Sequence, residues 1–203
     1  MSADRATLAV YDAEAARYAD ATQGLRDDPD LAAFVAAMPA GARVLDLGCG
    51  PGLAAEVMAR AGLDVEATDA SAEMVRRAAA RPGVTAWQAD FDALTGASVY
   101  HGVWANFSLL HAPRAAMPGH LAAIARALVP GGRLHIALKT GAGERRDALG
   151  RLYTYYDEDE LADLLAAAGF TVIARRRGRD PGLDGELADW IAMAALAAPA
   201  PRD

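Results

Sequence analysis

Short apolar runs alternate with segments of helical periodicity along most of the chain, and glycine, proline or aspartate residues separate them. Each run is five or six residues long, which is typical of strands buried on both faces of a sheet. Strands are therefore predicted at 43–47, 64–68, 84–88, 101–106, 133–138 and 170–175. Helices are predicted around them, at 4–24, 29–38, 53–61, 72–80, 114–128 and 157–168.

This alternation predicts an α/β fold with a doubly wound, mostly parallel sheet and helices on both faces. Residues 190–196 are ambiguous, because their alanines favour a helix while their place after a turn-rich segment favours a closing strand. With that strand, the sheet has about seven strands and the last one is antiparallel. No linker or repeat divides the sequence, so a single domain over 1–203 is expected. Ligands of such sheets bind beyond the carboxyl ends of the strands.

The composition narrows the function classes. Hydrophobic residues make up 53% of the 203 residues, enough for a buried core. The net charge of −7 disfavours a nucleic-acid partner, because a phosphate backbone attracts positive charge. A single cysteine excludes an internal disulfide, and the four histidines lack metal-ligand spacing, so no metal is expected. Without a membrane-length apolar run or a secretory core, the expected localisation is cytoplasmic, with no membrane partner.

A glycine-rich turn follows the first predicted strand, in the segment VLDLGCGPG at 44–52. Asp69 ends the second predicted strand, where a carboxylate suits hydrogen bonds to ribose hydroxyls. The glycine spacing is G-x-G-x-G and not the G-x-G-x-x-G of dinucleotide sites, and Asp46 stands two residues before the first glycine. A carboxylate there repels a pyrophosphate and attracts an ammonium group. The pattern therefore favours an adenosine cofactor that also carries an amino group.

This segment resembles motif I of the class I S-adenosylmethionine-dependent methyltransferases. The likeness continues through EATDAS at 66–71, QADF at 88–91 and LVPGGRL at 128–134, and it extends over roughly residues 8–196. Four blocks in order are more specific than one glycine turn. The resemblance implies a Rossmann-like methyltransferase domain with an N-terminal helical lid at 1–40, a cofactor-binding half at 41–140, and an acceptor loop with C-terminal strands at 141–203.

The resemblance also implies which residues bind S-adenosylmethionine. They are Tyr11, Tyr18, Asp46, Gly48, Cys49, Gly50, Gly52, Asp69, Ala70, Met74, Asp90, Phe91 and Asn106. In the family pattern, the carboxylate at 46 supports the ammonium group, the one at 69 binds the ribose and the one at 90 accepts from the adenine amino group. The glycines pack against methionine and ribose, Ala70 and Met74 flank the adenine, and Asn106 faces the transferred methyl. The two tyrosines belong to the lid.

Several of these side chains also have an ordinary structural interpretation. Asp46 could cap a helix, although a carboxylate inside an apolar run needs a partner. Asp90 could belong to a plain turn and Met74 to the core. Cys49 fits a small position in a tight turn better than a nucleophile, because no adjacent cation lowers its pKa. The lid tyrosines could simply pack the N-terminal helix.

The acceptor is expected beyond the fourth and fifth strands, where two polar loops follow. His111 is the candidate general base, and a helix-start histidine bonded to backbone is the alternative. Tyr155 and Arg151 are the other candidate catalytic residues. Tyr155 suits a sulfonium or an aromatic acceptor, while Arg151, Lys139 and Arg146 suit a carboxylate or phosphate on the acceptor. Exposed loops are commonly charged in any case.

The arginine cluster at 175–179 has no interleaved aromatic residues, so a solvated turn is expected there and not an RNA surface.

The expected function is methyl transfer from S-adenosylmethionine to an oxygen, nitrogen or sulfur atom of a small-molecule acceptor. Two alternatives stay open: an NAD(P)-dependent oxidoreductase on a Rossmann-like fold, and a non-catalytic S-adenosylmethionine-binding regulatory protein. The segment SLLHAP at 108–113 resembles small bacterial methyltransferases of unassigned acceptor, some labelled tellurite-resistance-like. It names no acceptor, and the oligomeric state stays open.

Overall fold

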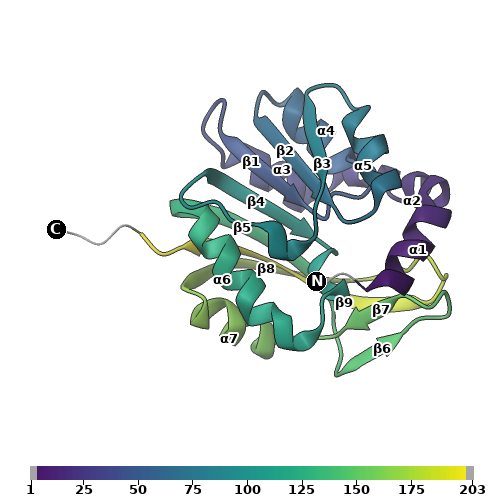
Figure 1. Ribbon diagram of the computed structural model, residues 1–203. Helices are drawn as coiled ribbons and strands as arrows, with labels where there is room; N and C mark the ends of the chain where they lie inside the picture. The colour runs from purple at the N-terminus through teal and green to yellow at the C-terminus, as the bar shows by residue number, and fades with distance from the viewer. Residues whose placement is uncertain (1–3, 200–203) are drawn as a thin grey trace.

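A seven-stranded sheet in the order β3-β2-β1-β4-β5-β9-β8 lies at the centre of the computed structural model, which describes residues 4–199 (Figure 1). Residues 1–3 of the expected lid and residues 200–203 lie outside the described residues. The strands are β1 (Arg43–Leu47), β2 (Asp64–Asp69), β3 (Val84–Gln88), β4 (Tyr100–Asn106), β5 (Leu128–Lys139), β8 (Phe170–Pro181) and β9 (Leu187–Ala197). Neighbours from β3 to β5 pair in parallel, whereas β9 is antiparallel to β5 and β8. The predicted sheet, with its antiparallel last strand, is confirmed.

Helices cover both faces of the sheet, as predicted (Figure 1). One face carries α3 (Pro29–Ala36), α4 (Leu53–Arg60) and α5 (Ala72–Ala79), and the other carries α6 (Met117–Ala127) and α7 (Glu158–Ala167). Successive strand side chains point to opposite faces, so Val44 packs with α3 and α4 while Leu45 packs with the α6 and α7 side. Asp46 therefore shares the face of Val44, next to the start of α4.

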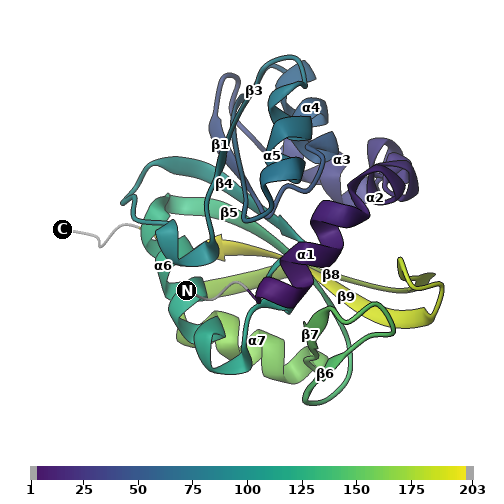
Figure 2. The same cartoon turned by 45° about the vertical axis from the view of Figure 1, so that its right-hand side comes forward.

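The N-terminal segment lies across the carboxyl ends of the strands as three short pieces (Figure 2). They are α1 (Arg5–Ala13), α2 (Ala15–Ala21) and the 3-10 helix η1 (Gln23–Asp27). The prediction of one helix over 4–24 is therefore wrong. The break at Glu14 lets α1 contact α5 and the 144–154 segment, while α2 reaches the turn between β8 and β9, where Arg17 donates to the Leu183 carbonyl.

The segment expected as an open loop after the fifth strand contains a small hairpin, β6 (Glu144–Arg146) paired with β7 (Leu152–Thr154). Each strand has only three residues and those of β6 are all charged, so neither has a pattern that predicts a strand. The predicted helix over 114–128 begins instead as a 3-10 turn, η4 (Arg114–Ala116), before α6. Two further 3-10 turns, η2 (Phe91–Ala93) and η3 (Leu109–His111), follow β3 and β4.

The arginine cluster lies within β8 and not in a turn, which corrects the prediction for 175–179. Arg175 and Arg177 both pair with Glu158 at the start of α7. Arg176, which points to the opposite face, pairs with two aspartates at the start of α3. The long antiparallel pairing with β9 keeps this polar strand in the sheet, because backbone hydrogen bonds do not depend on apolar side chains.

Candidate functional site

The glycine turn connects β1 to α4 with three residues of positive φ, at Gly48, Gly50 and Gly52. A Cβ on Gly48 would lie 2.3 Å from the Cβ of Ser108, so the chain after β4 approaches the turn directly. A Cβ on Gly52 would lie 2.7 Å from the backbone of Ala78, so this glycine lets α4 and α5 pack closely. Only glycine fits both the backbone conformation and the space.

Asp69, at the end of β2, connects the glycine turn to the start of α5. One carboxylate oxygen accepts a hydrogen bond from the Gly50 amide at 2.9 Å, and the other accepts from the Ser71 amide at 2.8 Å. Burial raises the pKa of Asp69, and these backbone donors offset part of that rise. The carboxylate therefore lies fixed at the edge of a cavity. Tyr18 of α2 covers the turn, with its ring edge 3.2 Å from the position that a Gly50 Cβ would take.

Asp46 is fully buried, and its Oδ2 atom has no hydrogen-bond partner within residues 4–199. Burial raises its pKa to about 7, although the backbone N–H of Ala55 in the first turn of α4 partly lowers it. The side chain lines a cavity of about 460 Å³ together with Cys49 and Asn106. An unpartnered carboxylate oxygen that faces a cavity is suited to a cationic ligand group such as an ammonium.

A second cavity, of about 70 Å³, lies between α1 and the ends of β1 and β2. It brings together eight residues from the predicted cofactor set: Tyr11, Tyr18, Gly48, Gly50, Asp69, Ala70, Met74 and Phe91. The lid residues Asp4, Thr7 and Leu8 line it too. Asp90 instead lines a separate cavity with Trp87 and Leu94, so the structure does not bring its side chain to Asp69.

A third cavity, of about 200 Å³, lies between α1, α2, β5, β7 and the turn after β8. Aromatic side chains form much of its wall: Tyr11, Tyr18, Phe107, Tyr153 and Trp190. Two cations line it. Arg151 is held by Asp147, with Nε and Nη2 at 2.8 and 2.6 Å from Oδ2, whereas Lys139 Nζ lies 4.2 Å from the centre of the Tyr153 ring.

Tyr18 and Phe107 line all three cavities and therefore mark the point where they meet. Phe107 has a positive φ of 53°, an uncommon conformation for a bulky residue and one that is found mostly where function demands it. It follows Asn106, the last residue of β4, whose side-chain oxygen accepts a hydrogen bond from His135 Nε2 at 3.0 Å. A reacting group at this junction would contact both aromatic rings.

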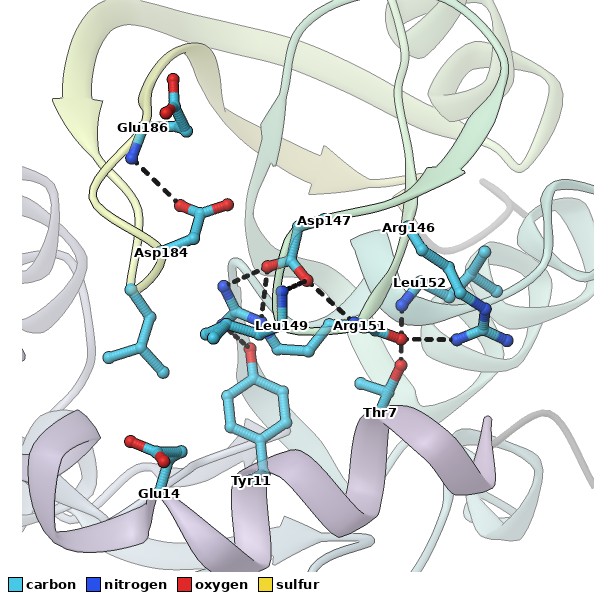
Figure 3. Close-up of polar contacts among 12 residues, drawn as sticks. Thr7, Tyr11, Glu14, Arg146, Asp147, Leu149, Arg151, Leu152, Asp184 and Glu186 are labelled. Carbon is cyan, nitrogen blue, oxygen red and sulfur yellow. Dashed lines mark hydrogen bonds and ion pairs between the residues drawn. The ribbon is translucent and has the colours of Figure 1, made fainter.

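His111 lies under the lid helix and contacts Tyr11. The two are joined by a 2.7 Å hydrogen bond between His111 Nε2 and Tyr11 Oη, and His111 Nδ1 lies 2.6 Å from the Leu152 carbonyl oxygen. Arg151 Nη1 donates to Tyr11 Oη at 3.2 Å (Figure 3). Burial lowers the pKa of His111 to about 4, so the imidazole is neutral near pH 7.

Tyr155, the third predicted catalytic residue, is buried in the core cluster that includes α6 and α7 side chains. Its ring lies against Gly141 and beneath the Arg145 guanidinium, 3.8 Å from the ring centre. Tyr153 is the tyrosine of this segment that lines the third cavity. Tyr153 and Lys139, and not Tyr155, therefore line the aromatic-walled cavity.

Sequence reasoning gave no role to four residues that shape these cavities: Thr7, Phe107, Ser108 and Trp190. It considered Tyr153 only as one of the loop tyrosines and favoured Tyr155. Thr7 accepts a hydrogen bond from the Leu152 amide at 2.8 Å, a contact across 145 positions (Figure 3). Trp190 reaches the cavities through the pairing of β9 with β5. Neither contact has a local sequence signal. Phe107 directly follows the predicted Asn106, and the end of a parallel strand was a usable signal for it.

No helix among residues 4–199 is long and apolar enough to span a bilayer. The same residues contain no group of three His, Cys, Asp or Glu side chains arranged to hold a metal ion.

The family model and the sequence relative that match this chain are both described as methyltransferases. A family model described as a methyltransferase domain matches residues 19–175, more than half of the chain. A segment of 38 residues is 60% identical to the ubiquinone biosynthesis O-methyltransferase of Xanthomonas axonopodis pv. citri. That match covers 19% of this chain and only 16% of the length of that relative.

Solved structures of methyltransferases share the fold. The 1,6-didemethyltoxoflavin-N1-methyltransferase of Burkholderia thailandensis, with bound 1,6-didemethyltoxoflavin and S-adenosylhomocysteine, is 27% identical, with a TM-score of 0.68 over 94% of this chain and 88% of that chain. A SAM-dependent methyltransferase of Methanosarcina mazei is 19% identical, with a TM-score of 0.74 over 85% of this chain and 98% of that chain. The family match together with these structures means that the chain belongs to the methyltransferase family and is an S-adenosylmethionine-dependent enzyme.

Proposed function

We propose that this enzyme methylates an oxygen, nitrogen or sulfur atom of a small aromatic acceptor that carries an anionic group. The observation that carries the proposal is Lys139, whose ammonium lies in an aromatic-walled cavity and has no ion pair with any carboxylate in residues 4–199. A half-buried cation without a carboxylate ion pair favours an anionic ligand, because burial penalises its charge and lowers its pKa, and the charge of Asp184 offsets only part of that effect.

On the donor side, we propose that the unpartnered Oδ2 of Asp46 accepts from the ammonium group of S-adenosylmethionine. Asp69 remains the candidate for the ribose hydroxyls, and Ala70, Met74 and Phe91 for the adenine. Gly48, Gly50, Cys49 and Asn106 would line the methionine, while Gly52 supports the turn through helix packing. Asp90 would have to reach the adenine from its own cavity, so among the three carboxylates it has the least structural support.

S-adenosylmethionine supplies an electrophilic methyl group that is already activated by its sulfonium. The protein has to align the acceptor with that methyl, exclude water and provide for a proton where the acceptor loses one. Tyr18 and Phe107, at the junction of the cavities, are suited to exclude water around the transferred methyl. Their ring faces also suit a cationic sulfonium.

Among residues 4–199, Lys139 is the cation of the acceptor cavity that has no salt bridge, whereas the other charged groups that line it have polar partners. Arg151 pairs with Asp147, and Asp180 accepts from the indole N–H of Trp190 at 2.7 Å. Arg146, which was also a candidate for anion binding, pairs with Asp4 on the lid at 2.8 Å. Lys139 is therefore the candidate to bind the anionic group of the acceptor. The aromatic walls favour a planar ring next to it, by stacking and edge-to-face contacts.

Two relatives are consistent with a small acceptor. The Burkholderia thailandensis enzyme binds 1,6-didemethyltoxoflavin and is named for methylation at N1, and the Xanthomonas relative is a ubiquinone biosynthesis O-methyltransferase. The negative net charge of this chain further favours a small molecule over a nucleic acid as the acceptor.

Titration calorimetry tests the acceptor class on the protein saturated with S-adenosylhomocysteine. The probes are 3,4-dihydroxybenzoate and catechol, which differ in one carboxylate. We expect 3,4-dihydroxybenzoate to bind at least about tenfold more tightly, a difference of about 1.4 kcal/mol. Lys139→Met should remove this preference and Lys139→Arg should keep it. Arg60→Met is the matched control, because Arg60 is exposed and pairs with Glu56 at the far end of α4. Equal binding of the two probes would contradict the proposal.

A further inference from the structure

We propose that Tyr11 of the lid helix is a catalytic residue: its hydroxyl takes the proton of the acceptor and passes its own proton to His111. This inference rests on the proposed acceptor cavity and assigns a different role to a residue that the family resemblance placed only in the lid. It also changes the role of His111, which becomes the proton acceptor behind Tyr11 and does not touch the acceptor molecule.

The positions of the two side chains require an intermediary. His111 lines the cofactor-side cavity, whereas Tyr11 lines both that cavity and the acceptor cavity. The Tyr11 hydroxyl, 2.7 Å from His111 Nε2, occupies the direction in which this nitrogen could accept a proton. A proton that leaves an acceptor beside Lys139 therefore reaches His111 through Tyr11 Oη.

The hydrogen bonds set the direction of the transfer. A carbonyl oxygen can only accept, so His111 Nδ1 carries a proton and donates it to the Leu152 carbonyl. In the neutral imidazole, Nε2 is then an acceptor and the Tyr11 hydroxyl donates to it. Arg151 Nη1 donates to Tyr11 Oη and fills one of its two lone pairs. The second lone pair, which the neighbouring Tyr153 hydroxyl also approaches, would accept from the acceptor's X–H group.

The surroundings of the pair hold this arrangement. Asp147 fixes the Arg151 guanidinium (Figure 3), and the Tyr153 ring lies 4.6 Å from the His111 ring. Burial and the positive charges of Arg151 and Lys139 lower the pKa of His111, while Asp147 and the Leu152 carbonyl raise it. The imidazole therefore rests in its neutral form, with Nε2 open to a proton that becomes acidic as the methyl group is transferred to X. Burial also raises the pKa of Tyr11, so its hydroxyl keeps its proton at rest.

Methyl transfer and proton transfer occur together at the acceptor atom. The acceptor atom X forms a bond with the methyl carbon as the carbon–sulfur bond breaks, and the sulfur keeps that electron pair. The proton on X moves to Tyr11 Oη, and the Tyr11 proton moves to His111 Nε2, which gives an imidazolium and a neutral tyrosine. The imidazolium returns its proton to solvent when the lid opens. The acceptor must therefore carry a hydroxyl, N–H or thiol group at the methylated atom.

The arrangement couples chemistry to closure of the lid. Tyr11 lies on α1, while His111 and Arg151 lie on the body of the protein, so the relay exists only when α1 is docked. An open lid separates the hydroxyl from both partners.

A long-range proton–nitrogen correlation spectrum tests the relay without any acceptor. The sample is the complex with S-adenosylhomocysteine, labelled with nitrogen-15 histidine, and His111→Gln assigns the signal. We expect His111 to carry its proton on Nδ1 with Nε2 unprotonated, and Tyr11→Phe to shift the Nε2 signal alone. A proton on Nε2 in the wild type, or an Nε2 signal that Tyr11→Phe leaves in place, would overturn the relay.

A kinetic experiment also tests the relay, with 3,4-dihydroxybenzoate as the acceptor and release of S-adenosylhomocysteine as the measured quantity. We expect Tyr11→Phe to lower kcat about 100-fold with a KM change below about threefold, as loss of general-base catalysis does. Tyr156→Phe is the matched control, because the buried Tyr156 hydroxyl has no hydrogen-bond partner within residues 4–199. An unchanged kcat in Tyr11→Phe would overturn the relay. If the wild type does not turn over this probe, the acceptor class fails, and the spectrum alone decides the relay.

Discussion

At the scale of single residues, the proposed role of Asp46 in cofactor binding opposes its effect on the stability of the fold. Its carboxylate is fully buried with an oxygen that lacks a partner within the described part of the chain, and burial raises its pKa to about 7. The unfolded pKa is near 3.8. The folded state therefore holds the proton more tightly, and ionised Asp46 destabilises the fold as the pH rises from about 4 to about 7.

Asp46→Asn tests this opposition. We expect the variant without ligand to be more stable than the wild type near pH 7, by about 1–3 kcal/mol, because it removes the unpaired charge. Its affinity for S-adenosylhomocysteine should fall at least about tenfold, since the ammonium group loses its counter-charge. Urea unfolding and titration calorimetry measure the two effects. The control is Asp64→Asn, because Asp64 is an exposed carboxylate at the start of β2. A variant that is less stable and binds normally would contradict the assignment.

At the scale of elements, the docked position of α1 depends mainly on polar contacts. Thr7 binds the Leu152 amide (Figure 3), Asp4 pairs with Arg146, and Tyr11 binds His111. The cavity beneath it, of about 70 Å³, is much smaller than the roughly 300–1,000 Å³ of typical ligand pockets. We infer that α1 moves away to admit the cofactor and docks again over it.

Hydrogen exchange measured by mass spectrometry tests this motion. Amides of residues 5–13 should exchange quickly without ligand and slow down when S-adenosylhomocysteine is bound. Thr7→Val should speed the exchange of α1 about fivefold, because one hydrogen bond to the body of the protein contributes about 1 kcal/mol. Thr22→Val serves as the comparison, since the Thr22 hydroxyl bonds only to carbonyls of α2. Equal exchange with and without ligand would show that α1 is not a lid.

At the scale of the whole molecule, two buried histidines connect the sheet and the lid to the pH dependence of folding. His111 lies beneath α1, and His135 of β5 stacks on Trp104 with ring centres 3.6 Å apart. Burial lowers the pKa of each, to about 4 and about 3, from an unfolded value of 6.5. The unfolded chain therefore binds more protons as the pH falls below about 6.5, and each histidine then reduces the stability of the fold.

Urea unfolding of His135→Gln and of the wild type, at neutral pH and at about pH 5, isolates the contribution of His135 to the pH dependence of stability. We expect the wild type to lose about 1–2 kcal/mol more than the variant between the two conditions. Asp46 changes the stability in the opposite direction over this range, but it is present in both proteins and cancels in the comparison. An identical pH dependence in the two proteins would mean that His135 takes up a proton in the folded state.

Most of the sheet and the cofactor side of the site could be predicted from local pattern. Strands of five or six apolar residues, followed by Gly48 or Asp69 at their carboxyl ends, indicate both the parallel order and the edge where ligands bind. The helix break at Glu14, the β6–β7 hairpin and the length of β8 could not be predicted in this way. Each of them depends on a partner that lies elsewhere in the chain.

The sequence by itself therefore determined the α/β alternation, the glycine turn, and the acidic residues Asp46 and Asp69 that favour an S-adenosylmethionine site. These features are local, because a turn or strand end depends on residues that are neighbours in the chain. Only the tertiary structure decided which charges are paired among residues 4–199, and it left Lys139 without a salt bridge in the cavity that we propose for the acceptor. It also decided that Tyr11 meets His111, 100 positions away. Such contacts arise from packing between distant elements, on which local periodicity carries no information.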